Sequence, residues 1–431
     1  MAKKKTVGKR RPAQTKKTKA KKTTTRKTSG LAGQKRGKQS AVELTYLDTE
    51  LGKLRHEIDH LDDAIIDLLN RRAGCAIQVG QLKAQHAQRA YVPERERQVL
   101  DRLVQKSKGP LLPDSLRQIY KEIISASLAL ESPLDVSYLG PEATFTHEAT
   151  KRHFGMSARL NARRTIAEVF DDVERERSDF GVVPIENSTE GVVSHTLDSF
   201  VSSDLIINAE ILLSVSHHLL NRSGTIGGIT KVYSHPQALA QCRNWLAQNL
   251  PGVPLVDVSS TARAAQLAAE DSTAAAIASD LAASLYSLQI AASHLEDLKS
   301  NMTRFLVIGT EEAAPSGADR TSVMFSVKHA PGILYRALAA FGRNEVNLSR
   351  IESRPSRKRA WEYLFFIDVD GHRLDAAVTE AIEELSEASV FIKVLGSYPR
   401  GALSSRTVGP TARRRAQERK QKSPTRRKAR R

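Results

Sequence analysis

The stretch LLNRRAGCAIQVGQLK, residues 68–83, decides how the N-terminal part of the chain folds. Upstream of it, apolar side chains recur at alternating steps of four and three residues, the spacing of a helix face that packs against other helices. The same spacing places Arg72 at the next seam position, where an apolar residue is expected. We therefore predict a long helix over about 44–85 whose buried seam carries an arginine. The seam residues are Leu47, Leu51, Leu54, Ile58, Leu61, Ile65, Leu68, Arg72, Cys75, Val79 and Leu82.

Two shorter helices are predicted after this one, and they also carry polar groups on their apolar faces. The second helix begins near Pro93, and the third begins with Asp114 or Ser115 as its N-cap and ends near Glu131. Lys83 returns to within roughly 20° of Arg72, about 16 Å along the helix axis. A buried charge is costly unless it is paired, so these cations favour an anionic ligand. Each residue taken singly could instead be a snorkelling side chain or a residue that fixes helix register.

These helices resemble the all-helical chorismate mutase family. The resemblance rests on LRHEIDHLDDAIIDLLNRRAGCAIQVGQLK, YVPERERQVL and EIISASLALE and covers about 90 residues of a domain predicted at 41–132. It implies an intertwined dimer of three-helix chains that rearranges chorismate to prephenate. It also implies that Arg55 reaches into the partner's site. The remaining site residues implied by the resemblance are Arg72, Lys83, Arg95, Glu96, Ser127 and Glu131, with Arg72, Lys83 and Glu131 as the catalytic set.

The residue types suit this reaction, because a pericyclic rearrangement needs a compact substrate conformer and fixed positive charge at the breaking C–O bond. Two positions depart from relatives. Val92 stands where some relatives have Asp, and Glu131 stands where others have Gln. A carboxylate at Glu131 would repel the ether oxygen of the substrate. We therefore expect the mutase activity to be favoured by mildly acidic pH.

From residue 135 the pattern changes to short β-branched runs that alternate with helical stretches, which is typical of an α/β domain and is predicted to end at 312. Its polar motifs stand at strand ends: YLGPEATFTHEA (138–149), GVVPIENSTEG (181–191), VYSHPQALAQC (232–242) and NMTRFLVIG (301–309). Each motif alone is weak, since Ser and Thr at such places are often caps. Together they resemble prephenate dehydratase.

That resemblance implies two α/β lobes with prephenate bound between them and converted to phenylpyruvate. It makes Thr303 the essential residue. The residues implied to line the cleft are Thr144, Thr146, Glu186, Asn187, Ser188, His235, Arg304 and Phe305. Arg304 could hold a substrate carboxylate through two hydrogen bonds, or it could serve as a structural ion pair.

Residues 320–399 read strand, helix, strand, strand, helix, strand, the order of a ferredoxin-like βαββαβ unit. With PGILYRAL and SRIESRP this unit resembles an ACT regulatory domain, which implies phenylalanine as effector. A plain dimerisation module is the alternative. The implied effector residues are Gly332, Ile333, Leu334, Glu352, Ser353, Arg354 and Pro355, although Ile333 stands where the family usually has Ala.

The two ends of the 431-residue chain are basic tails. Residues 1–40 hold 16 Lys and Arg and no acidic residue, and residues 400–431 hold 13 with one Glu. With almost no apolar residues they are predicted to be disordered. Nonspecific, salt-sensitive contact with nucleic acid or another polyanion is one reading of them, and a solvated, uninvolved tail is the other.

The sequence as a whole predicts a multidomain, bifunctional enzyme of phenylalanine biosynthesis that is inhibited by phenylalanine. We expect a homodimer or higher homo-oligomer in the cytoplasm, since the two cysteines read as free thiols of a reducing compartment. No cofactor, metal or membrane is expected. The alternative is a nucleic-acid-associated, amino-acid-sensing regulator with basic arms and one or both active sites decayed.

Overall fold

The computed structural model describes residues 32–86, 91, 93–328, 330–355 and 363–401. Val92 and most of both basic tails therefore lie outside the described residues. The chain divides into two units, one that ends at Asn70 and one that begins at Arg71. Within the described residues, no helix combines the length and the apolar composition that crossing a bilayer requires.

Helix α1 (Ala32–Gln85) contains the quoted stretch, as predicted. It begins at Ala32, so the prediction of disorder for residues 32–40 is wrong. Ala, Gln, Lys and Arg in this segment are good helix formers, and extending an existing helix by one residue is far easier than nucleating one. In the first unit the apolar seam is exposed, with Leu54 at 55%, Leu61 at 57% and Leu68 at 60%.

Helices α2 (Pro93–Lys106) and α3 (Pro113–Glu131) follow as predicted. The predicted N-cap of the third helix is wrong, because Leu112 is the cap and Pro113 opens the helix. Proline suits that first turn, where the missing N–H has no helical partner anyway. Helix α3 is tied to the α/β region, since the Ser125 hydroxyl donates to the Phe154 carbonyl at 2.9 Å.

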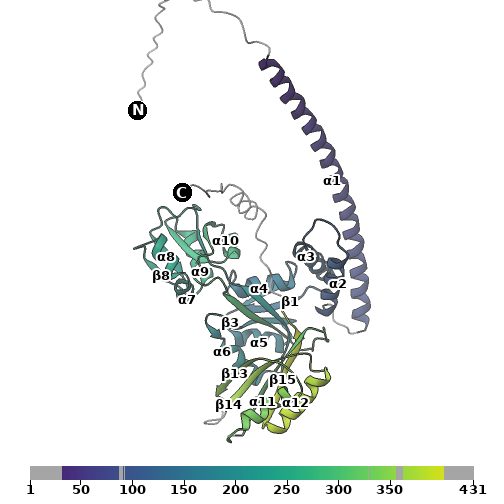
Figure 1. The fold of residues 1–431 in the computed structure, drawn as a ribbon, viewed down its shortest axis with the longest axis vertical. Coiled ribbons are helices and arrows are strands. Elements are labelled where there is room, and N and C mark those ends of the chain that lie inside the picture. Colours follow the sequence, from purple (N-terminus) through teal and green to yellow (C-terminus); the bar gives the residue numbers. More distant parts are fainter. Residues whose placement is uncertain (1–31, 87–90, 92, 329, 356–362, 402–431) are drawn as a thin grey trace, which may run out of the picture. The chain divides into compact units, whose positions relative to one another are not determined.

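The α/β region has two lobes, each built on its own sheet (Figure 1). The first sheet has the order β2-β1-β3-β11-β5, with β4 paired to β3. Strands β1 to β3 run parallel, whereas β11 is antiparallel to both β3 and β5. The elements of this lobe are β1 (Asp135–Leu139), α4 (Phe145–Phe154), β2 (Arg159–Arg163), α5 (Ile166–Glu174), β3 (Phe180–Asn187), β4 (Gly191–Val192), α6 (Ser194–Ser202), β5 (Ile206–Ser214) and β11 (Met302–Gly309).

The second lobe is inserted between β5 and β11, so the chain crosses between the lobes twice. The Val215 amide donates to the Asn301 carbonyl at 2.9 Å, which holds the two crossings together. Strand β11 therefore starts at the junction of the lobes. The second sheet has the order β10-β6-β9-β7-β8. Its elements are β6 (His218–Asn221), β7 (Lys231–Ser234), α7 (Pro236–Gln241), α8 (Arg243–Asn249), β8 (Leu255–Asp257), α9 (Thr261–Glu270), β9 (Ala274–Ala278), α10 (Asp280–Leu285) and β10 (Gln289–Ser293).

The C-terminal unit has the predicted βαββαβ order and an antiparallel sheet, β13-β14-β12-β15. Helices α11 and α12 cover one face of this sheet, and the other face packs on the first lobe (Figure 1). At Gly396 (φ 142°) a Cβ would lie 2.4 Å from the Ile207 carbonyl oxygen, so only glycine allows this contact. The elements are β12 (Asp319–Ser326), α11 (Ile333–Arg343), β13 (Leu348–Pro355), β14 (Tyr363–Asp370), α12 (Ala376–Ala388) and β15 (Phe391–Pro399).

Candidate active sites

Four of the predicted mutase residues lie together on α1 and α3. An Arg72 Nη1–H donates to the Ser127 hydroxyl, and the Lys83 ammonium lies 3.6 Å from a Glu131 carboxylate oxygen. Arg72 and Lys83 leave α1 about 16 Å apart, whereas Ser127 and Glu131 are only about 6 Å apart along α3. The two cations therefore converge, which is the geometry that a small anionic ligand requires.

Glu131 comes close to α1 because residue 80 is glycine. A Cβ added at Gly80 would lie 2.2 Å from the Glu131 Cγ atom. One carboxylate oxygen of Glu131 is buried and accepts no hydrogen bond from the described residues. Sequence reasoning missed Gly80, although a glycine one turn before Lys83 on an apolar face signals a close approach.

The structure does not bring Glu96 to this group, contrary to the prediction. Burial raises the pKa of Glu96, and the nearby Lys121 cation opposes that rise. The Tyr91 hydroxyl also bonds to the Glu96 carboxylate. A buried carboxylate needs a charged partner, and the partner of Glu96 is Lys121, which precedes Ser127 in α3. Arg95 is exposed on α2, and Arg55 is exposed in the first unit.

Thr303 lies at the start of β11, directly opposite Asn187 of β3. The Asn187 side-chain amide donates to the Thr303 hydroxyl oxygen at 2.7 Å. Thr303 is 9% exposed, so this hydroxyl is largely withdrawn from water. The two residues occupy the junction where the chain returns from the second lobe to the first.

The direction of this hydrogen bond follows from the other contacts of Asn187. Its carbonyl oxygen accepts from the backbone amide and the hydroxyl of Thr189 and from the Glu190 amide. Three donors on one oxygen fix the orientation of the side-chain amide, so its NH₂ group must face Thr303. Since Thr303 accepts from Asn187, its own O–H proton is free to be donated to another group.

The network extends to three residues that sequence reasoning missed. Asn301 accepts from Asn187 at 2.9 Å and donates to the side-chain oxygen of Gln241 at 3.0 Å. The same Gln241 oxygen lies 2.8 Å from the His217 Nε2 atom, and burial lowers the pKa of His217. Gln241 belongs to α7 of the second lobe, so the network joins the lobes. Asn301 and Gln241 stand inside quoted motifs, and those motifs were the available signal.

The other predicted dehydratase residues surround this junction or support the chain nearby. The Ser188 hydroxyl accepts a hydrogen bond from the Met302 amide at 2.9 Å and donates one to the Ser300 carbonyl. These two hydrogen bonds fix the start of β11. Thr144 caps α4, and Thr146 is buried in its first turn. His235 caps the short helix α7 through its ring Nδ1 atom.

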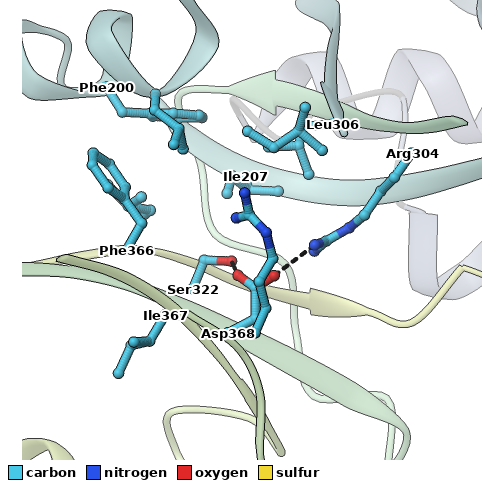
Figure 2. Close-up of a pocket in the computed structure, with 12 residues that line it drawn as sticks. Phe200, Ile207, Arg304, Leu306, Ser322, Phe366, Ile367 and Asp368 are labelled. Carbon is cyan, nitrogen blue, oxygen red and sulfur yellow. Dashed lines mark hydrogen bonds and ion pairs between the residues drawn. The ribbon is translucent and has the colours of Figure 1, made fainter. Parts of the chain in front are cut away.

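Arg304, Glu186 and Phe305 do not share the site of Thr303, contrary to the prediction. Successive residues on a strand point to opposite faces of the sheet, so Thr303 and Arg304 cannot face the same cleft. Arg304 instead bonds to Glu210 at 2.7 Å. It also bonds to Asp368 of β14 at 2.5 Å, as Figure 2 shows. Glu186 pairs with Arg350 of β13 at 3.2 Å. Phe305 lies in the hydrophobic core of the first lobe.

The same alternation divides the predicted effector residues. Gly332 has a left-handed backbone (φ 72°) and precedes α11, which starts with Ile333 and Leu334. In β13, Ser353 and Pro355 are exposed, whereas Glu352 and Arg354 share the face of Arg350 that is turned to the first lobe. Arg354 bonds to both oxygens of Asp198 in α6, at 2.9 and 3.1 Å. Glu352 and Arg354 therefore do not belong to the α11 side.

Similarities to known proteins cover all three regions in chain order. Family models match for chorismate mutase type II over residues 54–132, prephenate dehydratase over 136–313 and the ACT domain over 321–387. The chain is 48% identical to the bifunctional chorismate mutase/prephenate dehydratase of Aquifex aeolicus, over 82% of this chain and 99% of that one. Identity to the protein of the same name from Pseudomonas aeruginosa is 45%, with the same coverage.

A solved structure is also similar to this chain. It is the prephenate dehydratase of Arthrobacter aurescens in complex with L-Phe, with 34% sequence identity and a TM-score of 0.58. The match covers 66% of this chain and 98% of that one. Within the described residues, no cluster of His, Cys, Asp and Glu is arranged to hold a metal ion.

Proposed function

The chain belongs to the bifunctional chorismate mutase/prephenate dehydratase family, and on that premise we propose which residues carry each reaction. The enzyme rearranges chorismate to prephenate and converts prephenate to phenylpyruvate, two steps of phenylalanine biosynthesis. The ACT domain indicates feedback regulation by phenylalanine. The alternative, a nucleic-acid-associated regulator, has no support from the similar proteins.

In the dehydratase, Thr303 donates a hydrogen bond to the leaving hydroxyl of prephenate. The C–C bond to the ring carboxylate breaks, its electron pair becomes a ring double bond, and the C–O bond on the far side of the ring breaks. Carbon dioxide leaves, and the hydroxide takes up one proton from the solvent to become water. The observation that supports this role is the Asn187 amide, which donates to Thr303 and leaves the threonine proton available. Thr144, Thr146, Ser188 and His235 are the remaining substrate-site residues of this proposal.

In the mutase, Arg72 and Lys83 hold the substrate carboxylate and the ether oxygen, with Ser127 and Glu131 beside them. The support is the convergence of both cations on one turn of α3. A bound dianion would take over the charge pairing that Glu131 now gives Lys83. The proposal extends to Arg95 of the same chain and to Arg55 of a partner chain.

A second copy of the chain completes the mutase site in this proposal. The seam of α1 exposes a row of Leu and Ile at heptad-like spacing within the first unit, and such a row is stable in water only when it is covered. A second α1 offers the matching seam, and it would bring Arg55 with it. The proposed state is therefore a homodimer.

Phenylalanine binds the ACT domain beside the N-terminus of α11 in this proposal. Gly332, Ile333 and Leu334 supply the loop, and Ser353 and Pro355 lie on the exposed face of β13. The domain limits that go with this division are 41–132, 135–312 and 320–399. The family-model matches support those limits.

Two finer points of the proposal rest on the sequence. A cytoplasmic location is supported by the free thiols of Cys75 and Cys242. Nonspecific polyanion contact by the tails is supported by their charge alone, and those residues lie outside the described ones.

The test is a product time course from the purified enzyme supplied with chorismate alone, with and without phenylalanine. Phenylpyruvate should form, and its rate should fall as phenylalanine is added. Prephenate that accumulates would contradict the dehydratase assignment, and chorismate that persists would contradict the mutase assignment. A rate unaffected by phenylalanine would contradict the proposed effector.

A further inference from the structure

Four charged residues form a bridge between the dehydratase sheet and the ACT sheet. We call Glu186, Arg304, Arg350 and Asp368 the interdomain bridge. Arg304 bonds to Asp368 at 2.5 Å, and Arg350 pairs with Glu186 at 3.2 Å. Within the dehydratase sheet, Glu186 and Arg304 are opposite each other on β3 and β11. Within the ACT sheet, Arg350 and Asp368 are opposite each other on β13 and β14.

The bridge lies one residue away from the candidate catalytic pair. Asn187 follows Glu186 on β3, and Thr303 precedes Arg304 on the antiparallel strand β11, so both steps lead to the same neighbouring residue pair. The catalytic hydrogen bond and the bridge therefore occupy neighbouring rungs on opposite faces of one strand pair. A shift of the backbone at Glu186 or Arg304 would also move the adjoining backbone of Asn187 or Thr303.

The other end of the bridge leads to the proposed effector site. Arg350 is on β13, and the same strand continues to Ser353 and Pro355. Among the described residues, β13 is an edge strand that pairs with β14 alone. Ser353 and Arg350 are therefore only three residues apart on one short strand.

The two halves of the bridge differ in how firmly they are held. Arg304 also bonds to Glu210 and to the Tyr398 hydroxyl at 2.9 Å, and Asp368 accepts from Ser322. Burial alone would raise the pKa of Asp368, but Arg304 and Arg350 hold it below its usual range. This half is buried and fully paired. It is an anchor that fixes β11 on the ACT sheet.

Arg350 has more freedom than Arg304. Its Nη2 atom is buried and makes no hydrogen bond with the described residues. A cavity of about 10 Å³, room for about one water, is lined by Arg350 together with Arg304, Asp368 and Ser322 (Figure 2). The pairing with Glu186 is also single and longer than the contacts of Arg304. Arg350 has a spare donor and space to shift.

We propose that the interdomain bridge carries the phenylalanine signal from β13 to the Asn187–Thr303 pair, with Arg304–Asp368 as the fixed anchor and Arg350–Glu186 as the movable contact. Arg304 is then a positioning residue for Thr303 and not a substrate ligand. This inference rests on the proposed dehydratase and effector sites. It predicts that the anchor sets the rate of the uninhibited enzyme, whereas Arg350 sets the response to phenylalanine.

The test compares Arg350→Met with Arg343→Met, an arginine in an exposed ion pair on the helical side of the same ACT domain. Dehydratase rates are measured against phenylalanine concentration, and phenylalanine binding is measured by calorimetry. Arg350→Met should keep kcat within about twofold and still bind phenylalanine. Its half-inhibitory concentration should rise at least tenfold, while Arg343→Met behaves like the wild type. An unchanged half-inhibitory concentration, or lost binding, would overturn the role of Arg350.

The anchor is tested with Arg304→Lys, which keeps the charge but loses the planar fork that bonds Glu210 and Asp368 together. A misplacement of about 1 Å costs about 10²-fold in rate. We expect kcat for prephenate to fall by about that factor with KM within about threefold. A large rise in KM with unchanged kcat would mean that Arg304 binds substrate, and the bridge would be wrong. If phenylalanine does not inhibit the wild-type enzyme, both the proposed effector site and the role of the interdomain bridge are contradicted.

Discussion

The mutase helices and the dehydratase–ACT half of the molecule differ in how complete a single chain makes them. In the dehydratase, Thr303 is fixed by Asn187, and Asn187 is fixed in turn by three donors. In the first unit, by contrast, the apolar seam of α1 is open to water, and Arg55 is exposed. One chain thus completes the directed hydrogen-bond network of the dehydratase, whereas in the proposed dimer a second copy completes the mutase site. The two activities should therefore respond to different kinds of damage.

The largest effect is expected at Thr303. Thr303→Val keeps the shape of the side chain but removes the donated proton, so the dehydratase rate with prephenate should fall by about 10³-fold. The mutase rate with chorismate should not change. Thr230→Val, at an exposed threonine of the second lobe, is the matched control and should leave both rates alone. A dehydratase loss of less than tenfold would rule out Thr303 as the principal donor.

A charge placed in the apolar seam of α1 should lower the mutase rate and leave the dehydratase rate nearly unchanged. Leu61→Glu places a charge in the row of apolar residues that a second chain would cover, so the dimer should dissociate. We expect the mutase rate to fall by about 10²-fold, while the dehydratase rate stays within about threefold. Mass measured by light scattering reports the dissociation. Lys53→Glu, at an exposed residue paired with Glu50, is the control for added negative charge on the same helix. A dimer that survives Leu61→Glu would contradict the proposed interface.

The approach of Glu131 to α1 offers a smaller, local test. Gly80→Ala introduces a Cβ that would overlap the Glu131 side chain and push it away from Lys83. The mutase rate should fall by about tenfold. Gly74→Ala, on the same helix with open space around it, should have little effect on the rate. Equal losses in both variants would mean that the effect comes from the helix and not from Glu131.

The strands show what a sequence motif can and cannot establish. The motif NMTRFLVIG correctly indicated a buried strand, but reading Thr303 and Arg304 as one site ignored the alternation of a strand. The pairing of Arg304 with Asp368 could not be predicted, because the two residues are distant in sequence and meet only when the ACT sheet packs on the first lobe. The same holds for Arg354 and Asp198. The quoted residues 68–83 did better, because helix periodicity is local and brings Arg72 and Lys83 to one face.

Contacts between distant segments explain the remaining misses. The sequence around Glu96 gives no sign that Lys121 is its partner. The start of α1 at Ala32 depends on extension of the helix from the apolar seam. Gln241 and Asn301 meet only because the second lobe is inserted between β5 and β11. The domain order and the βαββαβ topology were predictable, since both depend on local patterns. The polar partners were not.

The smallest expected effect concerns stability at the joint between α3 and α4. Burial and, to a smaller extent, the Lys121 cation lower the pKa of His153 to about 3. In the unfolded chain the pKa is near 6.5, so between these values the unfolded state binds the extra proton and stability is lost as pH falls. From pH 6.5 to 5 the free energy of unfolding should drop by about 1–2 kcal/mol from this group. Chemical denaturation of His153→Phe should lack that part of the drop, and an identical slope in both proteins would contradict it.

The most direct test of separate sites uses Arg72→Ala and Thr303→Val, each supplied with chorismate and followed for both products. Thr303→Val should accumulate prephenate, and Arg72→Ala should leave chorismate untouched while still converting added prephenate. An equimolar mixture should form phenylpyruvate, because the prephenate released by one variant feeds the other. Loss of both activities in either folded variant would contradict the account, since the two reactions would then share one site.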